Sequence, residues 1–397
     1  MHNIRNVTGR VIYVGGNDRR CQIFEGKYPV SSGMAYNSYL IKGEVNILVD
    51  TADASIAGLF LENVQAALNG DSLNYVVVQH MEPDHSATLM SILSKYPEAK
   101  VITSPKSVPM IKQFFGNDIS GRLVPAVEGE PFEAPGVTLD FINAPMVHWP
   151  EVIMTYFREE KVFFSADAFG SFGALEGRIV MDPSVYDTYV DEARRYYTNI
   201  VGKYGAQVQM ALKKASAFDI EWIAPLHGYI WKDGKELILD SYGKWSTFTP
   251  EVKGVCIIAG SVYGNTLQAA EILAAEVCAA GGDAVVIDTS VKHWSYAVAC
   301  AYKYSAFAIM AATNDGGIFA PAEHAVRALA AHGVKGRKAA YIDNGTWAAV
   351  AGKQITDIIS GMKDVSVSEN SFSIKSSLTA DDLPKIRALA AEMISDP

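Results

Sequence analysis

The chain has 397 residues, of which 49% are hydrophobic and 20% charged, enough for two or three domains with cores of their own. Its net charge is −10 at pH 7 and no basic cluster stands out, so nucleic acid and anionic membranes are disfavoured as partners. No apolar stretch is long enough to span a bilayer, and the first residues lack the apolar core of a signal peptide. We therefore expect a cytoplasmic protein.

The cysteines form no C-x-x-C pair, which argues against a zinc ribbon, a rubredoxin-type iron site or a disulfide framework. Free cysteine is among the most often buried residues, and a reducing compartment keeps thiols free. We therefore expect four packed thiols. They are Cys21, Cys256, Cys278 and Cys300.

The first part of the chain, to about residue 250, has the pattern of a strand-rich α/β domain. Lys42-Gly43-Glu44 and Arg158-Glu159-Glu160 resemble hairpin turns between apolar runs. Residues 75–79 have the β-branched composition of a buried strand. In chain order the predicted strands are Asn37–Leu40, Val45–Asp50, Tyr75–Gln79, Val101–Thr103, Val137–Ile142, Met154–Phe157, Lys161–Ser165 and Trp222–Leu226, and the predicted helices are Ser55–Leu68, Ser86–Lys95, Ser107–Phe115, Tyr186–Lys203 and Ala206–Ala217.

The pattern changes near residues 247–251, after which strands and helices alternate regularly. Five such units in about 145 residues are typical of a small, doubly wound parallel sheet. We therefore expect one domain at 1–250 and a second at 251–397. The predicted strands are Gly254–Gly260, Asp283–Asp288, Phe307–Ala312, Lys338–Ile342 and Val365–Ser368, with helices starting near Thr266, Lys292, Pro321, Val350 and Thr379.

Four potential metal ligands lie within six residues, directly after the apolar run Tyr75–Val78. They are His80, Glu82, Asp84 and His85. A strand end is a rigid place for ligands, and the loop beyond it can wrap around an ion. Glu82 stands where two-zinc hydrolases with this spacing usually carry a histidine.

Three more candidates, His148, Asp167 and His227, recur in the same context, each after an apolar strand. Four imidazoles and three carboxylates suffice for two ions, and Asp167 is the natural bridge because each oxygen can bind one of them. A nitrogen and oxygen set without thiolate suits non-haem iron, although manganese or zinc can use the same ligands.

The first strand of the second domain ends in a phosphate-loop pattern where a helix begins. Backbone N–H groups and small hydroxyls at a helix N-terminus can hold a terminal phosphate. In a flavodoxin-like order, the loops after the third and fourth strands would hold a flavin ring, and Trp347 would stack on it or shield it. The expected flavin-binding residues are Ser261, Val262, Tyr263, Gly264, Asn265 and Thr266 in the first loop, Thr313, Asn314, Asp315 and Gly316 in the second, and Asn344, Gly345, Thr346 and Trp347 in the third.

Together these motifs resemble the flavodiiron proteins over essentially the whole chain. The resemblance implies a metallo-β-lactamase-like αββα sandwich followed by a flavodoxin-like, doubly wound parallel sheet. By the family's metal motif, His80, Glu82 and His148 would bind one iron, and Asp167 would bridge to the other. The second iron would be held by Asp84, His85 and His227. The third flavin loop is poorer in glycine than the commonest form.

The family's activity is reduction of dioxygen to water or of nitric oxide to nitrous oxide at a di-iron site, with electrons relayed by FMN. The sequence resembles the two-domain class, so we expect an external donor such as rubredoxin. The family forms head-to-tail homodimers, which bring the FMN of one subunit beside the irons of the other. We expect such a dimer, or a dimer of dimers.

Two other functions are compatible with part of the pattern. A two-zinc hydrolase fused to a flavodoxin domain accounts for six of the ligands but leaves Glu82 and the flavin without a role. A non-catalytic electron carrier or gas sensor accounts for the flavin loops but not for a complete ligand set. The sequence does not decide between dioxygen and nitric oxide.

Overall fold

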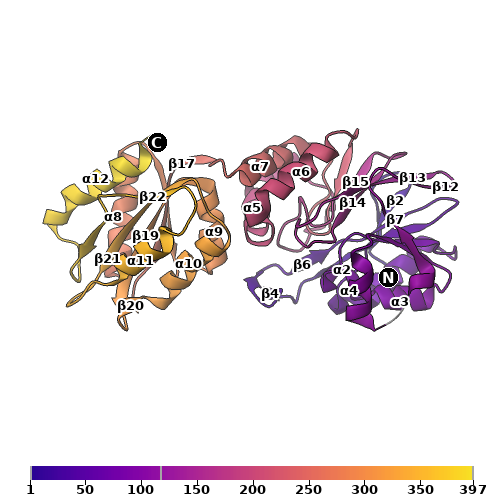
Figure 1. Cartoon of the computed structure of the whole chain (residues 1–397), viewed down its shortest axis with the longest axis horizontal. Coiled ribbons are helices and arrows are strands. Elements are labelled where there is room, and N and C mark those ends of the chain that lie inside the picture. The colour runs from indigo at the N-terminus through magenta and orange to yellow at the C-terminus, as the bar shows by residue number, and fades with distance from the viewer. Residues whose placement is uncertain (1, 117–118, 396–397) are drawn as a thin grey trace. The chain divides into compact units, whose positions relative to one another are not determined.

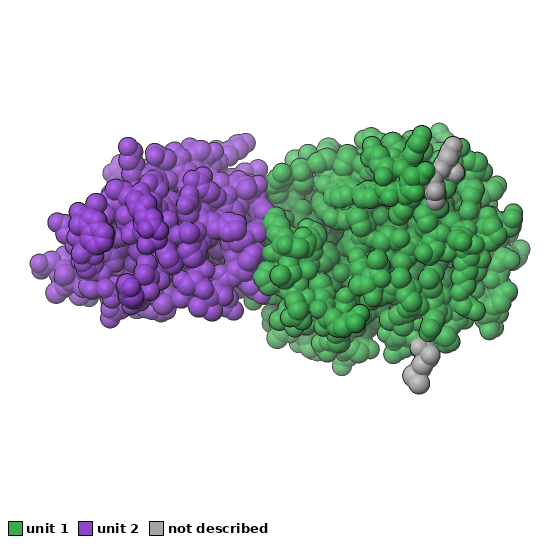
Figure 2. Space-filling model, turned by 90° about the horizontal axis from the view of Figure 1, so that it is seen from below, with its two compact units in different colours: residues 1–243 green, residues 244–397 purple. Residues whose placement is uncertain are grey.

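The computed structural model describes residues 2–116 and 119–395. The chain divides into two compact units, residues 1–243 and 244–397, which are coloured separately in Figure 2. Within the described part of the chain, none of the helices is long and apolar enough to cross a bilayer.

The first unit contains two large sheets (Figure 1). The first sheet has the order β1-β2-β7-β8-β9-β10-β11 and the second β12-β13-β14-β15-β16. Two short antiparallel pairs, β3 with β6 and β4 with β5, lie outside them. The strands are β1 (Arg5–Asn6), β2 (Val11–Tyr13), β3 (Gly16–Asp18), β4 (Ile23–Phe24), β5 (Tyr28–Pro29), β6 (Met34–Tyr36), β7 (Tyr39–Ile41), β8 (Ile47–Val49), β9 (Tyr75–Val78), β10 (Lys100–Thr103), β11 (Leu123–Pro125), β12 (Phe132–Ala134), β13 (Val137–Asn143), β14 (Ile153–Phe157), β15 (Val162–Phe164) and β16 (Trp222–Ala224).

The core of this unit lies between the two sheets. Val49 and Ile102 of the first sheet belong to the same buried cluster as Leu139 and Phe164 of the second. Helices lie on the outer side of each sheet, α3 and α4 beside one and α5 to α7 beside the other (Figure 1). This is the predicted αββα sandwich. The helices are α1 (Ala57–Leu68), α2 (Pro83–Ser86), α3 (Leu89–Lys95), α4 (Ser107–Phe115), α5 (Tyr186–Ile200), α6 (Gly205–Ala215) and α7 (Lys235–Thr247), which continues into the second unit.

The second unit is a parallel sheet of order β18-β17-β19-β21-β22, which is the flavodoxin-like order 2-1-3-4-5. Helix α8 packs on α12, and α10 packs on both α9 and α11. The elements are β17 (Val252–Gly260), α8 (Asn265–Ala279), β18 (Asp283–Asp288), α9 (Trp294–Lys303), β19 (Tyr304–Asn314), β20 (Gly317–Ile318), α10 (Ala320–Ala331), β21 (Arg337–Asn344), α11 (Ala351–Ile359), β22 (Val365–Val367), β23 (Phe372–Ile374) and α12 (Leu383–Ile394).

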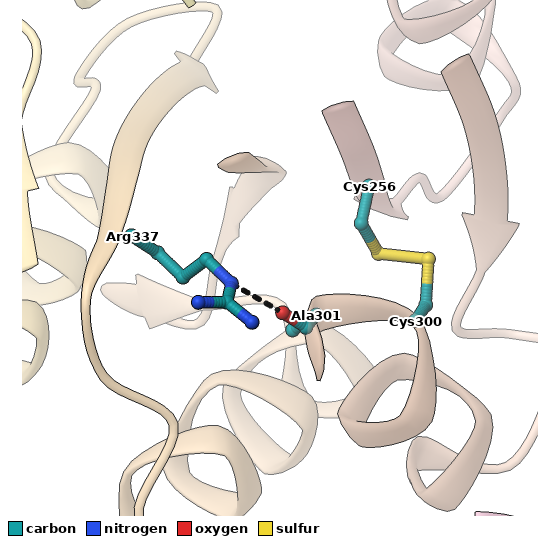
Figure 3. Close-up of a disulfide and its surroundings, with 4 residues drawn as sticks. All are labelled: Cys256, Cys300, Ala301 and Arg337. Carbon is teal, nitrogen blue, oxygen red and sulfur yellow. Dashed lines mark hydrogen bonds between the residues drawn. A yellow bond between two sulfur atoms is a disulfide. The ribbon is translucent and has the colours of Figure 1, made fainter. Parts of the chain in front are cut away.

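The prediction of four packed thiols was wrong. Cys256 of β17 and Cys300 of α9 form a disulfide with Cα atoms 5.8 Å apart, and Cys278 is exposed (Figure 3). The two paired residues are 44 positions apart, so no local spacing pattern predicts the disulfide. Beside it, the buried Arg337 donates from Nε to the carbonyl of Ala301 at 3.1 Å and ties β21 to the last turn of α9 (Figure 3).

The structure also changes the expected start of one helix. The sequence predicted a helix beginning at Ser86, but α2 already begins at Pro83, and a break separates it from α3. Proline at the first helical position suits such a start, because its fixed φ matches the helix and its missing N–H would be unpaired there. Asp84 and His85 therefore project from a helical turn rather than from a loop.

Candidate metal centre and flavin site

Four side chains of the first ligand group converge on one point. The ligand atoms of His80, Glu82, His148 and Asp167 all lie within 4.8 Å of one another. Nε2 of His148 is 2.9 Å from Oε2 of Glu82 and 3.1 Å from Oδ2 of Asp167. Nε2 of His80 is 3.2 Å from the same Glu82 oxygen. Such a set of two imidazoles and two carboxylates surrounds a position that suits a cation.

The second group consists of Asp84, His85 and His227, which meet the same distance criterion. Oδ2 of Asp84 is 3.3 Å from Nε2 of His85 and 3.1 Å from Nε2 of His227. Oδ1 of Asp167 is 3.1 Å from Nε2 of His85, whereas its Oδ2 faces the first group. One carboxylate thus points one oxygen at each group, which is the geometry of a bridge between two ions.

The ligands come from strand ends of both sheets. His80 follows β9, and Asp84 and His85 lie on α2. His148 lies between β13 and β14, and Asp167 and His227 follow the parallel neighbours β15 and β16. Because parallel strands end at the same edge, segments far apart in the sequence meet there. All seven side chains predicted as ligands are brought together.

Two residues at the end of β8 hold the first ligand loop through hydrogen bonds. Asp50 accepts from the backbone N and from Nε2 of Gln79, both at 2.8 Å, which fixes the residue before His80. The hydroxyl of Thr51 donates to the carbonyl of His85 at 2.7 Å. These supporting residues were missed by the sequence analysis because nothing in their own neighbourhood marks them.

The charge state of the cluster is that of a cation site. Burial alone would raise the pKa of Asp167, but His85 and His148 hold it well below its usual value. Burial also opposes ionisation of Glu82, yet His148 and His80 lower its pKa to about 2. Metal binding requires neutral imidazoles, and the three ligand carboxylates then carry three negative charges, which two divalent cations more than offset.

Unpaired polar atoms support the same interpretation. Among the described residues, both carboxylate oxygens of Asp84 and of Asp167 are buried without a hydrogen-bond partner, as is Nε2 of His227. Buried polar atoms are rarely left in this state unless an ion or ligand completes them. The donor set therefore fits a pair of metal ions.

Aromatic side chains cover the cluster. Trp149 lies edge-on to His80, with ring centroids 5.3 Å apart, and Tyr196 is 5.5 Å from His227. The next residue, Tyr197, instead packs against Tyr242 with ring centroids 4.9 Å apart. The sequence alone cannot tell these neighbouring tyrosines apart, because the orientation of α5 decides which one faces the ligands.

A cleft of about 600 Å³ opens onto the metal centre. Glu82 and Asp84 lie at its base, and it is further lined by Asp18, Glu25 and Asp53. None of the described residues that line it is basic. Access to the candidate metal centre therefore runs between acidic side chains.

The three loops predicted to bind flavin follow β17, β19 and β21, at the carboxyl edge of the second unit's sheet. In the first loop, Gly264 has a φ of 95° and precedes α8, and its N–H is bonded to Oγ of Ser261 at 3.0 Å. Nδ2 of Asn344 donates to the hydroxyl of Thr266 at 3.2 Å, which joins the first loop to the third. The open N-terminus of α8 with these hydroxyls fits a terminal phosphate.

The second and third loops have different conformations. Asp315 and Gly316 form the turn between β19 and β20, as an isolated hairpin would. In the third loop a Cβ on Gly345 would lie 2.3 Å from the carbonyl oxygen of Ala348, so only glycine fits there. Trp347 is 93% exposed and free to cover a ring bound at this edge.

Comparison with known proteins agrees with this architecture. The model of a family described as ODP family beta lactamase matches residues 34–228. The uncharacterised protein MJ0732 of Methanocaldococcus jannaschii is 30% identical over 271 residues, which is 68% of this chain and 67% of that protein. The anaerobic nitric oxide reductase flavorubredoxin of Aliivibrio fischeri is 30% identical over 273 residues. That match covers 68% of this chain but 54% of the flavorubredoxin, so the chain spans about half of that relative.

Solved structures match along nearly the whole chain. The flavodiiron protein of Giardia intestinalis superimposes with a TM-score of 0.94 at 25% identity, covering 99% of this chain and 96% of its own. Rubredoxin oxygen:oxidoreductase of Desulfovibrio gigas has a TM-score of 0.91 at 22% identity, covering 99% and 98%, and so shares the fold.

Fold and site together define a metallo-β-lactamase-like domain with two adjoining ligand groups, followed by a flavodoxin-like domain. The chain belongs to the flavodiiron proteins, the family that carries FMN and a di-iron centre. The resemblance seen in the sequence is thus confirmed.

Proposed function

We propose that this chain reduces dioxygen to water, nitric oxide to nitrous oxide, or both, at two iron ions held by the two ligand groups. The observation that carries the proposal is the placement of Asp167, whose two oxygens face separate groups 3.1 Å from a histidine nitrogen on each side. Glu82 adds a hard oxygen donor where a zinc hydrolase of this type has a histidine. That donor favours a redox-active metal over zinc.

Bound iron and FMN would supply the electrons, four for dioxygen or two for a pair of nitric oxide molecules. The protein's own contribution is to orient the metal pair, through the hydrogen bonds that fix the ligands, and to limit access. Trp149 and Tyr196 cover the ligands from the protein side. The cleft between acidic side chains offers an approach for a small uncharged molecule.

The electron donor and assembly belong to the same proposal. We propose an external donor such as rubredoxin, consistent with the name of the Desulfovibrio gigas relative. A head-to-tail homodimer, or a dimer of dimers, would place FMN on one subunit beside the irons of another, and the protein would work in the cytoplasm.

Anaerobic stopped-flow mixing of the reduced, iron-loaded protein with each gas tests the activity. We expect rapid reoxidation by at least one gas, and a loss of more than about 100-fold in His80→Ala and Asp167→Ala, because a lost ligand costs at least as much as a lost supporting contact. Reoxidation that persists in both variants would contradict the proposal and leave the metal site idle.

Metal analysis separates the proposal from hydrolysis. Protein isolated without oxygen should contain iron at two ions per chain. Two zinc ions and no iron would favour a two-zinc hydrolase.

In the stopped-flow experiment, slow and equal reaction with both gases would argue against dioxygen and against nitric oxide as the substrate.

A further inference from the structure

The two ligand groups differ in what lies behind their histidines. Nδ1 of His80 is 2.9 Å from Oε1 of Glu151, and both side chains are fully buried. In the second group, Nδ1 of His227 is instead 2.7 Å from the backbone carbonyl of Ala35. Nδ1 of His85 has no hydrogen-bond partner among the described residues. A carboxylate therefore hydrogen-bonds a histidine of the first group, whereas among the described residues no carboxylate hydrogen-bonds Nδ1 of either histidine of the second.

The side chain of Glu151 is fixed by a second hydrogen bond besides the one to His80. Its Oε1 also accepts from the backbone N of Met81 at 2.9 Å, so one oxygen binds both the ligand and the residue after it. Its Oε2 is buried without a hydrogen-bond partner among the described residues. No described lysine or arginine forms an ion pair with it, so its charge acts on His80 without local compensation.

A carboxylate that accepts the Nδ1 proton of a metal-bound histidine fixes the tautomer and makes Nε2 a stronger donor. In His80 the free Nε2 is the atom that faces Glu82 and Asp167. The first metal position therefore receives a stronger nitrogen donor than the second, and this stabilises the higher oxidation state of an ion bound there.

We propose that Glu151 is a positioning residue that makes the two metal positions unequal, acting through His80 so that the metal of the first group is bound more tightly and oxidised first. The oxidation is a one-electron step from the ferrous to the ferric ion, with the electron passing to the oxidant. The proposal rests on the ligand assignment but not on which gas is reduced.

The test uses Glu151→Gln in the full chain, because an amide oxygen can still accept both hydrogen bonds while the charge is lost. Glu128→Gln is the matched control: Glu128 lines the same cavity as Glu151 but pairs with Lys214 at the surface. Zinc binding to the metal-free proteins is measured by competition with a coloured chelator. We expect Glu151→Gln to weaken one of the two binding steps by about 10- to 100-fold and to leave the other unchanged.

The second readout is a redox titration of the iron-loaded proteins followed by electron paramagnetic resonance. Wild type and Glu128→Gln should show two separate one-electron steps. In Glu151→Gln the potential of one step should rise, by about 59 mV if the ferric preference falls tenfold. Glu151→Asp keeps the charge and should remain closer to wild type.

Three results would overturn the proposal: equal weakening of both zinc steps, no change in either step, or unchanged potentials. If Glu151→Gln does not fold, the wild type still decides, because two zinc ions bound with equal intrinsic affinity would mean equivalent positions. Zinc binding needs no iron, flavin or gas. A protein with unequal zinc sites that reduced neither gas would therefore reject the proposed function and leave this inference standing.

Discussion

At the scale of single residues, the metal centre influences groups that do not bind it. Glu25 lies at the turn of the β4–β5 hairpin and lines the cleft. Desolvation raises its pKa to about 8, with the negative charge of Glu82 adding to the increase and His148 opposing it. In metal-free protein at pH 7 this carboxyl is therefore mainly protonated.

The protonated state of Glu25 affects how many protons the protein releases when it binds metal. Metal binding neutralises Glu82 and its neighbours, so the pKa of Glu25 should fall, while the larger effect of desolvation remains. We expect Glu25→Gln to release fewer protons than wild type on metal binding at pH 7. Calorimetry in buffers of different ionisation enthalpy measures the number, and Glu128→Gln should behave as wild type. If Glu25→Gln released as many protons as wild type, metal binding would not be coupled to the protonation of Glu25.

The raised pKa of Glu25 also determines how its contribution to the stability of the metal-free protein changes with pH. In metal-free protein the folded state holds this proton between the ordinary pKa of 4.5 and about 8, where the unfolded chain has lost it. The contribution of Glu25 to stability is therefore lost as the pH rises through that window.

Which site residues could be predicted depends on where their signal lies. The ligands between His80 and His85 can be recognised by their spacing. His148, Asp167 and His227 can be recognised because each follows an apolar run. Glu151 and Asp50 carry no such mark, since Glu151 acts on His80, 71 positions away, and Asp50 acts on Gln79, 29 positions away. Only the pairing of strands brings them to the site.

At the scale of elements, the disulfide links the strand that leads into the predicted phosphate loop to a helix packed on the sheet. A cross-link between residues 44 positions apart restricts the unfolded chain. For a loop of that length the stabilisation is about 4 kcal/mol on the chain-entropy argument. The bond is thus a substantial fraction of the stability of a unit this size.

We therefore expect Cys300→Ala to lower the free energy of unfolding of the second unit by about 4 kcal/mol. Urea unfolding followed by the fluorescence of released FMN measures it. Reduction of the wild type with dithiothreitol should give a similar loss, whereas Cys278→Ala, at an exposed thiol, should not. A reduced wild type with an unchanged midpoint would contradict the prediction.

Elements were predictable where a pattern repeats. Regular alternation of strand and helix patterns revealed the five main strands of the second unit, including β18 and β22, which are not buried. The strands β1 to β5 have two or three residues each, too few for a period to show. Helix α7 was also missed, although Ile238, Tyr242 and Trp245 lie at helical spacing along it and are buried. The disulfide lies beyond any local pattern.

At the scale of the whole molecule, the two candidate cofactor sites belong to separate compact units. If electrons pass between subunits, two inactive variants should complement each other. Asp167→Ala removes the bridging metal ligand, and Ser261→Asp places a negative charge where the flavin phosphate would bind. In a head-to-tail dimer of the two, one subunit's FMN still meets the other's intact metal centre.

Coexpression of the two variants measures this directly. Random assembly makes about half of the dimers mixed, each with one intact pair of cofactors, so activity should recover to about one quarter of wild type. Each variant alone should be inactive. Absence of recovery in a mixture shown by mass spectrometry to contain mixed dimers would mean that transfer stays within one subunit.

The acidic cleft over the metal centre has a consequence for what reaches it. Asp18, Glu25 and Asp53 stand before the ligands, and none of the described lining residues is basic. An uncharged diatomic gas crosses such an entrance without electrostatic cost, whereas azide and nitrite approach against like charge. The entrance is thus a charge filter: it discriminates between a neutral gas and small anions that bind iron before either touches the metal.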